Sequence, residues 1–119
     1  MEKLVIIIKH AEDEPEYCIE AMVMAVNASS SGLHPVVILQ SKGASIAKKG
    51  FAREIVMPNL PSLEGLIERF IQSGGRLLVS TPALRIRDIR GEDLIEGAMV
   101  VNVGATMREI RDAKHVLAY

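Results

Sequence analysis

Short apolar runs, separated by turn residues and amphipathic stretches, make up most of this chain. The first run, residues 4–8, is continuous and β-branched, which is typical of a strand buried on both faces of a sheet. Comparable runs predict further strands at residues 35–39, 76–80 and 98–103, a short extended segment at 54–57 and a closing edge strand at 115–119.

The stretches between these runs have helical patterns. Residues 14–31 predict a long helix that Asp13 caps and Gly32 ends. Since apolar residues extend around most of this helix, we expect it to be buried on two sides. A second helix, capped by Ser62, is predicted where apolar residues recur at i, i+3, i+4, i+7 and i+8. These residues are Leu63, Leu66, Ile67, Phe70 and Ile71.

Shorter helical elements complete the pattern. They are expected at residues 44–49, 82–86 and 92–95. A last helix is expected to begin at Gly104 and to direct Met107, Ile110 and Ala113 toward the core. The alternation of strands and helices favours a three-layer α/β fold with a mostly parallel sheet of about five strands. With 119 residues, the chain is expected to form one domain over residues 1–119.

Charge and cysteine content limit the classes of function. A net charge of -1 and an isoelectric point of 6.3 argue against a nucleic-acid or anionic-membrane partner. Proteins that bind such partners usually carry an excess of basic residues. The N-terminus lacks the layout of a signal peptide, and no apolar run reaches the roughly 20 residues that span a bilayer. We therefore expect a cytoplasmic protein. With Cys18 as the one cysteine, no intramolecular disulfide can form.

Polar residues follow the predicted strands, where the loops of a parallel sheet meet at one edge. They are His10, Ser41, Lys42, Gly43, Ser80, Thr81 and Asn102, with Arg85 close behind. Helix N-termini at such an edge present free backbone N–H groups, so these residues predict a crevice that binds a small anion. A structural interpretation stays open. In it, Ser80 and Thr81 cap the helix at 82–86, and the arginines of that region pair with nearby acids or with water.

Motifs that would assign a cofactor are absent. The chain has no P-loop spacing, no Gly-x-Gly-x-x-Gly after the first strand, and no metal-ligand spacing among its three histidines. We therefore expect neither a cofactor nor a metal ion. Ser80 with His10 as its base would make a serine hydrolase, although the chain has no Gly-x-Ser-x-Gly motif.

Cys18 is the only thiol, and two interpretations of it are open. It lies one turn into the first predicted helix, where the helix dipole lowers the pKa of a thiol and favours reactivity. It also lies on an apolar helix beside Met22 and Ala25, at i+4 and i+7, as a buried structural cysteine would.

Three segments, taken in order, resemble one known family. The first is the apolar opening strand with its loop and alanine-containing helix. The second is the stretch 74–89, in which a double glycine precedes a strand and the segment Ala-Leu-Arg-Ile-Arg-Asp-Ile, and the third is the closing stretch 107–119. Together they resemble the DsrE/DsrF-like family, related to TusD-type sulfur-relay subunits, over essentially the whole chain. The resemblance implies a compact α/β fold that assembles into dimers, trimers or hexamers, and a sulfur-handling partner protein.

The resemblance also implies a chemistry from which this chain departs. In the sulfur-transferring members, a cysteine at the end of the third main strand carries sulfur as a persulfide, and the matching position here is Ser80. A hydroxyl cannot form a persulfide, so we expect a non-catalytic homo-oligomeric subunit, structural or anion-binding, linked to sulfur metabolism. The alternative is a sulfur carrier or sulfurtransferase that uses Cys18, and whether the chain is an enzyme stays open.

Overall fold

Five parallel strands form one sheet in the order β4-β3-β2-β1-β5. The structure is a computed structural model, and it describes all residues from 1 to 119. The strands are β1 (Glu2–Ile8), β2 (Leu33–Leu39), β3 (Arg76–Ser80), β4 (Ala98–Val101) and β5 (His115–Ala118). The predicted α/β class with a parallel sheet is therefore confirmed, because each strand run found in the sequence, apart from the segment at 54–57, pairs within this sheet.

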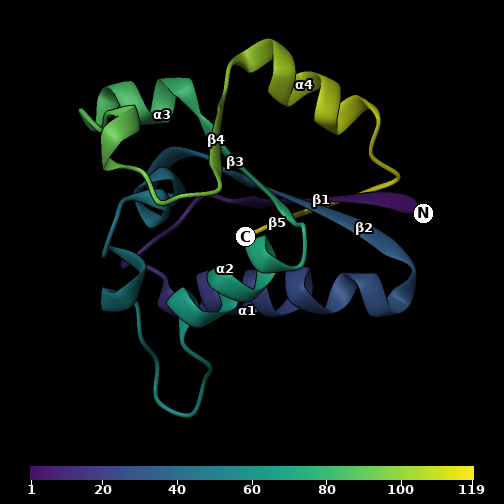
Figure 1. Cartoon of the computed structure of the whole chain (residues 1–119), viewed down its shortest axis with the longest axis horizontal. Helices are drawn as coiled ribbons and strands as arrows, with labels where there is room; N and C mark the ends of the chain where they lie inside the picture. Colours follow the sequence, from purple (N-terminus) through teal and green to yellow (C-terminus); the bar gives the residue numbers. More distant parts are fainter.

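Helices cover both faces of the sheet. The α-helices are α1 (Pro15–Asn27), α2 (Leu63–Gln72), α3 (Thr81–Ile86) and α4 (Val103–Arg111), and the 3-10 turns are η1 (Ala28–Ser31), η2 (Ser41–Ala47), η3 (Ala52–Glu54) and η4 (Gly91–Asp93). Figure 1 shows α1 and α2 along one side of the sheet and α4 on the opposite side. The short α3 follows β3 directly and contacts η2. None of these helices combines the length and the apolar character that crossing a membrane requires.

The face beneath α1 and α2 carries the main hydrophobic core, a single cluster of 26 buried residues. The stripe predicted for α2 supplies four of them, Leu63, Leu66, Ile67 and Phe70. Its last member, Ile71, is only partly buried. The predicted cap of α2 is confirmed, because the Ser62 hydroxyl accepts a hydrogen bond from the backbone N–H of Gly65 at 3.2 Å.

The opposite face has a much smaller buried cluster, made of Val5, Val36, Ile38 and Leu78. Ile110 of α4 and Ala113 after it pack against this cluster, as predicted. The prediction for Met107 is wrong, because its side chain is 57% exposed and Thr106 is the buried residue of that turn. Thus α4 carries apolar side chains on two sides, and only one side faces the sheet.

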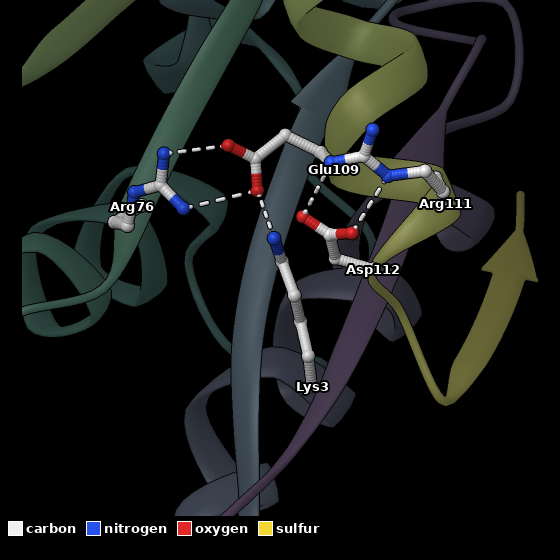
Figure 2. Close-up of polar contacts among 5 residues, drawn as sticks. All are labelled: Lys3, Arg76, Glu109, Arg111 and Asp112. Atoms are coloured by element: carbon white, nitrogen blue, oxygen red, sulfur yellow. Dashed lines mark hydrogen bonds and ion pairs between the residues drawn. The ribbon is translucent and has the colours of Figure 1, made fainter.

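An ionic cluster joins α4 to the sheet at the amino ends of β1 and β3 (Figure 2). The guanidinium of Arg76 on β3 donates to both carboxylate oxygens of Glu109 at 3.0 and 2.7 Å, and Lys3 of β1 pairs with the same carboxylate. The hydrogen bonds from Arg76, together with Lys3, outweigh partial burial and lower the pKa of Glu109 from 4.5 to about 2. A separate, exposed pair joins Arg111 to its neighbour Asp112 at 2.8 Å (Figure 2).

Two short elements predicted in the middle of the chain are wrong in type or extent. Residues 54–57 form no strand, because η3 occupies their start and no neighbouring strand pairs with the rest. The helix predicted at 44–49 is instead the 3-10 turn η2, which begins at Ser41 and ends at Ala47. It ends early because Lys48 leaves it and forms an antiparallel bridge with Leu94.

The ends of other elements also differ in detail. Asp13 does not cap α1, since Glu14 occupies that position without a side-chain bond and the carboxylate of Asp13 accepts instead from the Ala11 N–H at 2.9 Å. The helical segment that begins with α1 continues through η1, and Gly32 ends it at a φ of 77°, as predicted. The strand predicted at 98–103 stops at Val101, because α4 begins two residues later. The helical turn expected at 92–95 forms one residue earlier, as η4.

Candidate binding site at the carboxyl edge of the sheet

The carboxyl ends of β2 and β3 border a hollow of about 280 Å³. It is lined by Gln40, Ser41, Ser80, Pro82, Ala83, Ile86 and Arg87. Because β2 and β3 pair in parallel, residues that leave the two strands emerge at the same rim. The structure thereby brings Ser41 and Ser80 together, as the strand-end argument predicted, and Ser41 bends the chain there with a positive φ of 51°.

Arg87, rather than Arg85, supplies the positive charge of this hollow. The side chain of Arg87 is partly buried and donates to the carbonyl oxygen of Ala83 at 3.1 Å, so it lies back along α3. Arg85, one of the predicted ligand residues, is exposed and does not line the hollow. Helical spacing could have found Arg87, since it follows Ala83 by four residues and shares its side of the chain.

His10 and Lys42 meet elsewhere, at the end of β1, where both contact Asp13. The Nδ1 of His10 lies 2.8 Å from the Asp13 carboxylate, and the Nζ of Lys42 lies 3.5 Å from the same oxygen. The Ala11 N–H and then His10 hold the pKa of Asp13 far below its usual range, so this carboxylate is ionised and contacts both side chains. The role of Asp13 was missed because the sequence placed it at a helix cap.

The structure does not bring Ser80 and His10 into one site. Their strands, β3 and β1, are separated by β2, and the Nδ1 of His10 is engaged by Asp13. A general base must lie within hydrogen-bond reach of the hydroxyl that it deprotonates. The serine-hydrolase hypothesis therefore gains no geometric support.

Three other predicted ligand residues have structural roles. A side chain at Gly43 would overlap the carbonyl oxygen of Ile8, so glycine is needed there for close backbone approach. The Thr81 hydroxyl donates to the carbonyl oxygen of Val101 at 2.9 Å and ties α3 to β4. The side-chain oxygen of Asn102 accepts from the Ala105 N–H at 2.8 Å and caps α4.

The proposed cap of α3 is also wrong. Ser80 occupies the N-cap position, but its hydroxyl makes no capping hydrogen bond. The Thr81 hydroxyl is committed to β4, as described above. The Ser80 side chain, which is partly exposed, is therefore available to the hollow that it lines.

Cys18 lies in the main core under the loop that follows β1. Its Sγ donates to the carbonyl oxygens of His10 at 3.1 Å and Ala11 at 3.5 Å. Burial, and then the negative charges of Asp13 and Glu12, raise the pKa of this thiol to about 12. At neutral pH the group is a protonated thiol rather than the thiolate that acts as a nucleophile.

No group of three or more histidine, cysteine, aspartate or glutamate side chains is arranged to hold a metal ion. The carboxyl edge of the sheet thus has a hollow with two hydroxyls, an amide and a guanidinium. The exposed carboxylate of Asp13, which already contacts His10 and Lys42, lies at the same edge. The groups of the hollow can orient and neutralise a small ligand, since they are hydrogen-bond donors that suit oxyanions.

A parallel sheet covered by helices on both faces, with a polar hollow at two strand ends, defines a three-layer α/β protein with a strand-end site. Within that class, the chain belongs to the DsrE/DsrF-like family, whose family model matches residues 2–119. A curated relative, the uncharacterized protein MJ0989 of Methanocaldococcus jannaschii, is 26% identical over 117 residues, covering 98% of this chain and 99% of that protein.

Two solved structures are similar to this chain over their whole lengths. The ychN protein from E. coli superposes with a TM-score of 0.82 at 18% sequence identity, with 100% of both chains covered. The protein of unknown function MTH1491 from Methanobacterium thermoautotrophicum superposes with a TM-score of 0.73 at 19% identity, also with full coverage of both. At these identities the likeness concerns the fold, and it agrees with the α/β architecture described above.

Proposed function

We propose that this chain is a non-catalytic DsrE-like subunit that binds a small anion in the hollow at the ends of β2 and β3. The family to which it belongs is associated with sulfur metabolism. Sulfur oxyanions such as thiosulfate, sulfite and sulfate are therefore the first anions to test.

One observation carries the proposal, namely the set of groups that reaches the hollow. The hydroxyls of Ser41 and Ser80, the amide of Gln40 and the guanidinium of Arg87 line it, without any carboxylate or thiol. An arginine surrounded by neutral donors favours a bound anion, because charge-assisted hydrogen bonds to an oxyanion are stronger than neutral ones. The absence of a thiol at this rim supports a binding role rather than persulfide transfer.

The anion is tested by titrating each of the three oxyanions into isotope-labelled protein and following backbone amide resonances. We expect saturable shifts at Ser41, Ser80 and Arg87. Arg87→Met should weaken the affinity about tenfold or more, as expected for the loss of one charge-assisted hydrogen bond. Arg85→Met removes the same charge from an exposed site outside the hollow and should leave the affinity almost unchanged. Equal losses in the two variants would mean that the anion responds to overall charge, and would contradict the proposed site.

The competing function is sulfur carriage by Cys18, and intact mass separates the two. After incubation with a sulfane-sulfur donor, the native chain should keep its mass, because the thiol is buried and protonated. A stable gain of one sulfur atom that disappears in Cys18→Ala would overturn the non-catalytic proposal. The same donor applied to unfolded protein is the positive control, since it exposes the thiol.

Ser80→Cys tests separately whether position 80 corresponds to the family's reactive position. A thiol at that place would be partly exposed at the rim of the hollow, beside Arg87, which favours its thiolate form. We expect this variant to gain one sulfur atom from the same donor. A folded variant that stays inert would count against the correspondence.

We also propose that the chain forms a homo-oligomer through β4 and the outer side of α4. β4 is an edge strand, and both it and α4 leave apolar side chains exposed. They are Met99 and Val100 on β4 and Val103 and Met107 on α4. An unpaired strand edge with exposed apolar side chains on it and on the neighbouring helix favours pairing with another copy.

Light scattering tests the assembly and its surface. The wild type is expected to be larger than a monomer at micromolar concentration, and Met107→Glu is expected to dissociate it. Met24→Glu is the matched control, because Met24 is also an exposed methionine but lies on α1. A monomeric wild type would contradict the assembly. Dissociation by Met24→Glu alone would move the interface to α1, the helix that the sequence predicted to be buried on two sides.

A further inference from the structure

A second cavity, of about 490 Å³, opens between α2 and two chain segments that lie opposite it. It shares no residue with the hollow at the strand ends. Its volume falls in the range of about 300 to 1,000 Å³ that is typical of small-molecule sites. The site assigned to anion binding does not account for it.

Backbone pairing holds the wall opposite α2 in place. Lys48 forms an antiparallel bridge with Leu94, the Ile95 N–H donates to the Ala47 carbonyl oxygen at 2.8 Å, and the Lys49 N–H donates to that of Asp93 at 2.9 Å. The α2 wall presents positions 64, 67, 68, 71 and 72, which recur at helical spacing on one side of the helix. One wall is thus a helix and the other is held by backbone hydrogen bonds, and the cavity exists before any ligand arrives.

The apolar part of the cavity is aliphatic and incompletely covered. Ile46 and Ile67 are buried beneath it, whereas Ile71 and Ile95 remain partly exposed. Ile71 is the one member of the α2 stripe that the core does not bury. A Cβ at Gly97, whose φ is +95°, would approach the Cγ2 of Ile71 to 2.7 Å, so a side chain there would crowd this surface. A hydrocarbon group in the cavity would remove these isoleucines from water, which is favourable.

The charged part of the cavity is mostly acidic. Glu64, Glu68 and Glu96 line it, against Lys48 as the one cation of the lining. Arg53 lies 3.4 Å from Glu64 and partly neutralises it, whereas Glu68 and Glu96 form no ion pair. The combination of an aliphatic surface and two unpaired carboxylates is complementary to a ligand with a hydrocarbon body and a positive head.

We propose that this cavity binds an amphiphilic organic cation. An ammonium group lies between Glu68 and Glu96, and an aliphatic chain of a few carbons covers Ile71 and Ile95. This site is independent of the anion site, so each can fail without the other.

Three probes of equal chain length test the proposal: n-hexylammonium, hexanol and hexanoate, each followed by amide chemical shifts. Hexylammonium is expected to bind saturably at about millimolar concentration, with shifts at Ile71, Ile95 and Gly97. Hexanol should bind about tenfold more weakly and hexanoate should not bind. Hexanol or hexanoate binding as tightly as the amine would overturn the proposal, and so would the absence of amine binding.

Variants locate the cation and the hydrocarbon. Glu68→Gln with Glu96→Gln should weaken hexylammonium about tenfold, whereas Glu16→Gln, an exposed glutamate of α1 outside the cavity, should not change it. Ile71→Trp fills the cavity and should abolish binding in a chain whose circular dichroism is unchanged. A fall in oligomer mass on Ile71→Trp, without amine binding to the wild type, would assign the cavity to a contact between chains and overturn the proposal.

Discussion

The two faces of the sheet are covered in different ways. Beneath α1 and α2, one cluster of 26 residues is buried, and it includes the largest core side chain, Phe70. Beneath α4, four residues are buried, and the helix is joined to the strands by the carboxylate of Glu109 shared between Arg76 and Lys3 (Figure 2). The first face depends on hydrophobic burial, and the second combines a small apolar contact with an ionic one.

The outward sides of the helices can be compared in the same way. In α4, Val103 and Met107 lie one turn apart on the same side of the helix, and both are exposed to solvent. On the thickly covered face, Ile71 of α2 is left open only where the larger cavity lies. The thickly covered face also has exposed apolar side chains, Tyr17 and Met24 of α1, so both faces leave apolar groups on the outward sides of their helices.

Truncation of a core side chain should give the largest effect and tests the ranking of the two faces. Phe70→Ala removes a ring that is 1% exposed and should lower the free energy of unfolding by about 3 to 5 kcal/mol. Ile110→Ala removes a partly buried side chain on the α4 face and should cost about 1 kcal/mol. Urea denaturation measures both, and equal losses would contradict the ranking.

Removing the charge of Glu109 without changing the size of its side chain should have a smaller effect. Glu109→Gln keeps the size of the side chain but leaves Arg76 and Lys3 without their shared carboxylate, so we expect a loss of about 1 kcal/mol in the free energy of unfolding. The matched control is Asp112→Asn, whose pair with Arg111 is fully in solvent and should give no measurable change. Hydrogen exchange should rise in α4 of the Glu109→Gln variant and not in α2. An equal rise in both helices would show that the link does not act locally.

The sheet and α2 were predictable because the hydrophobic pattern of each segment fits only one secondary structure and one buried side. A continuous β-branched run such as 4–8 fits a strand covered on both faces, and the α2 stripe leaves one side of a helix to bury. The orientation of α4 was not predictable, because Val103 with Met107 and Thr106 with Ile110 both have spacing i, i+4. Periodicity finds a helix but cannot choose between two stripes, and burial of Thr106 depends on its hydroxyl, which donates to the Asn102 carbonyl oxygen at 3.0 Å.

The candidate site was predictable only as far as strand order determines it. The sequence alone predicted that Ser41 and Ser80 lie at one rim, because they follow two parallel strands, and β2 and β3 do pair in parallel. The same reasoning included Gly43 and Asn102, because a residue that ends a strand for packing or capping has the same position as one that binds a ligand. Nothing in the spacing showed that Asp13 would pair with His10 and draw it away, since that depends on loop geometry.

The smallest expected effect is a pH dependence that isolates the α4 link. The pKa of Glu109 is lowered in the fold from 4.5 to about 2, so its ionised form stabilises the folded state at pH values above 4.5. This stabilisation is lost as the pH falls from 4.5 toward 2, because the proton then binds the unfolded chain first and finally both states. The difference in unfolding free energy between the wild type and Glu109→Gln should therefore be constant from pH 7 to about pH 5 and shrink below it. Phe70→Ala should keep its deficit unchanged over the same range, since no charge is removed. Urea denaturation at each pH measures both differences, and a Glu109→Gln deficit that stays constant down to pH 3 would show that the α4 face does not depend on this carboxylate being ionised.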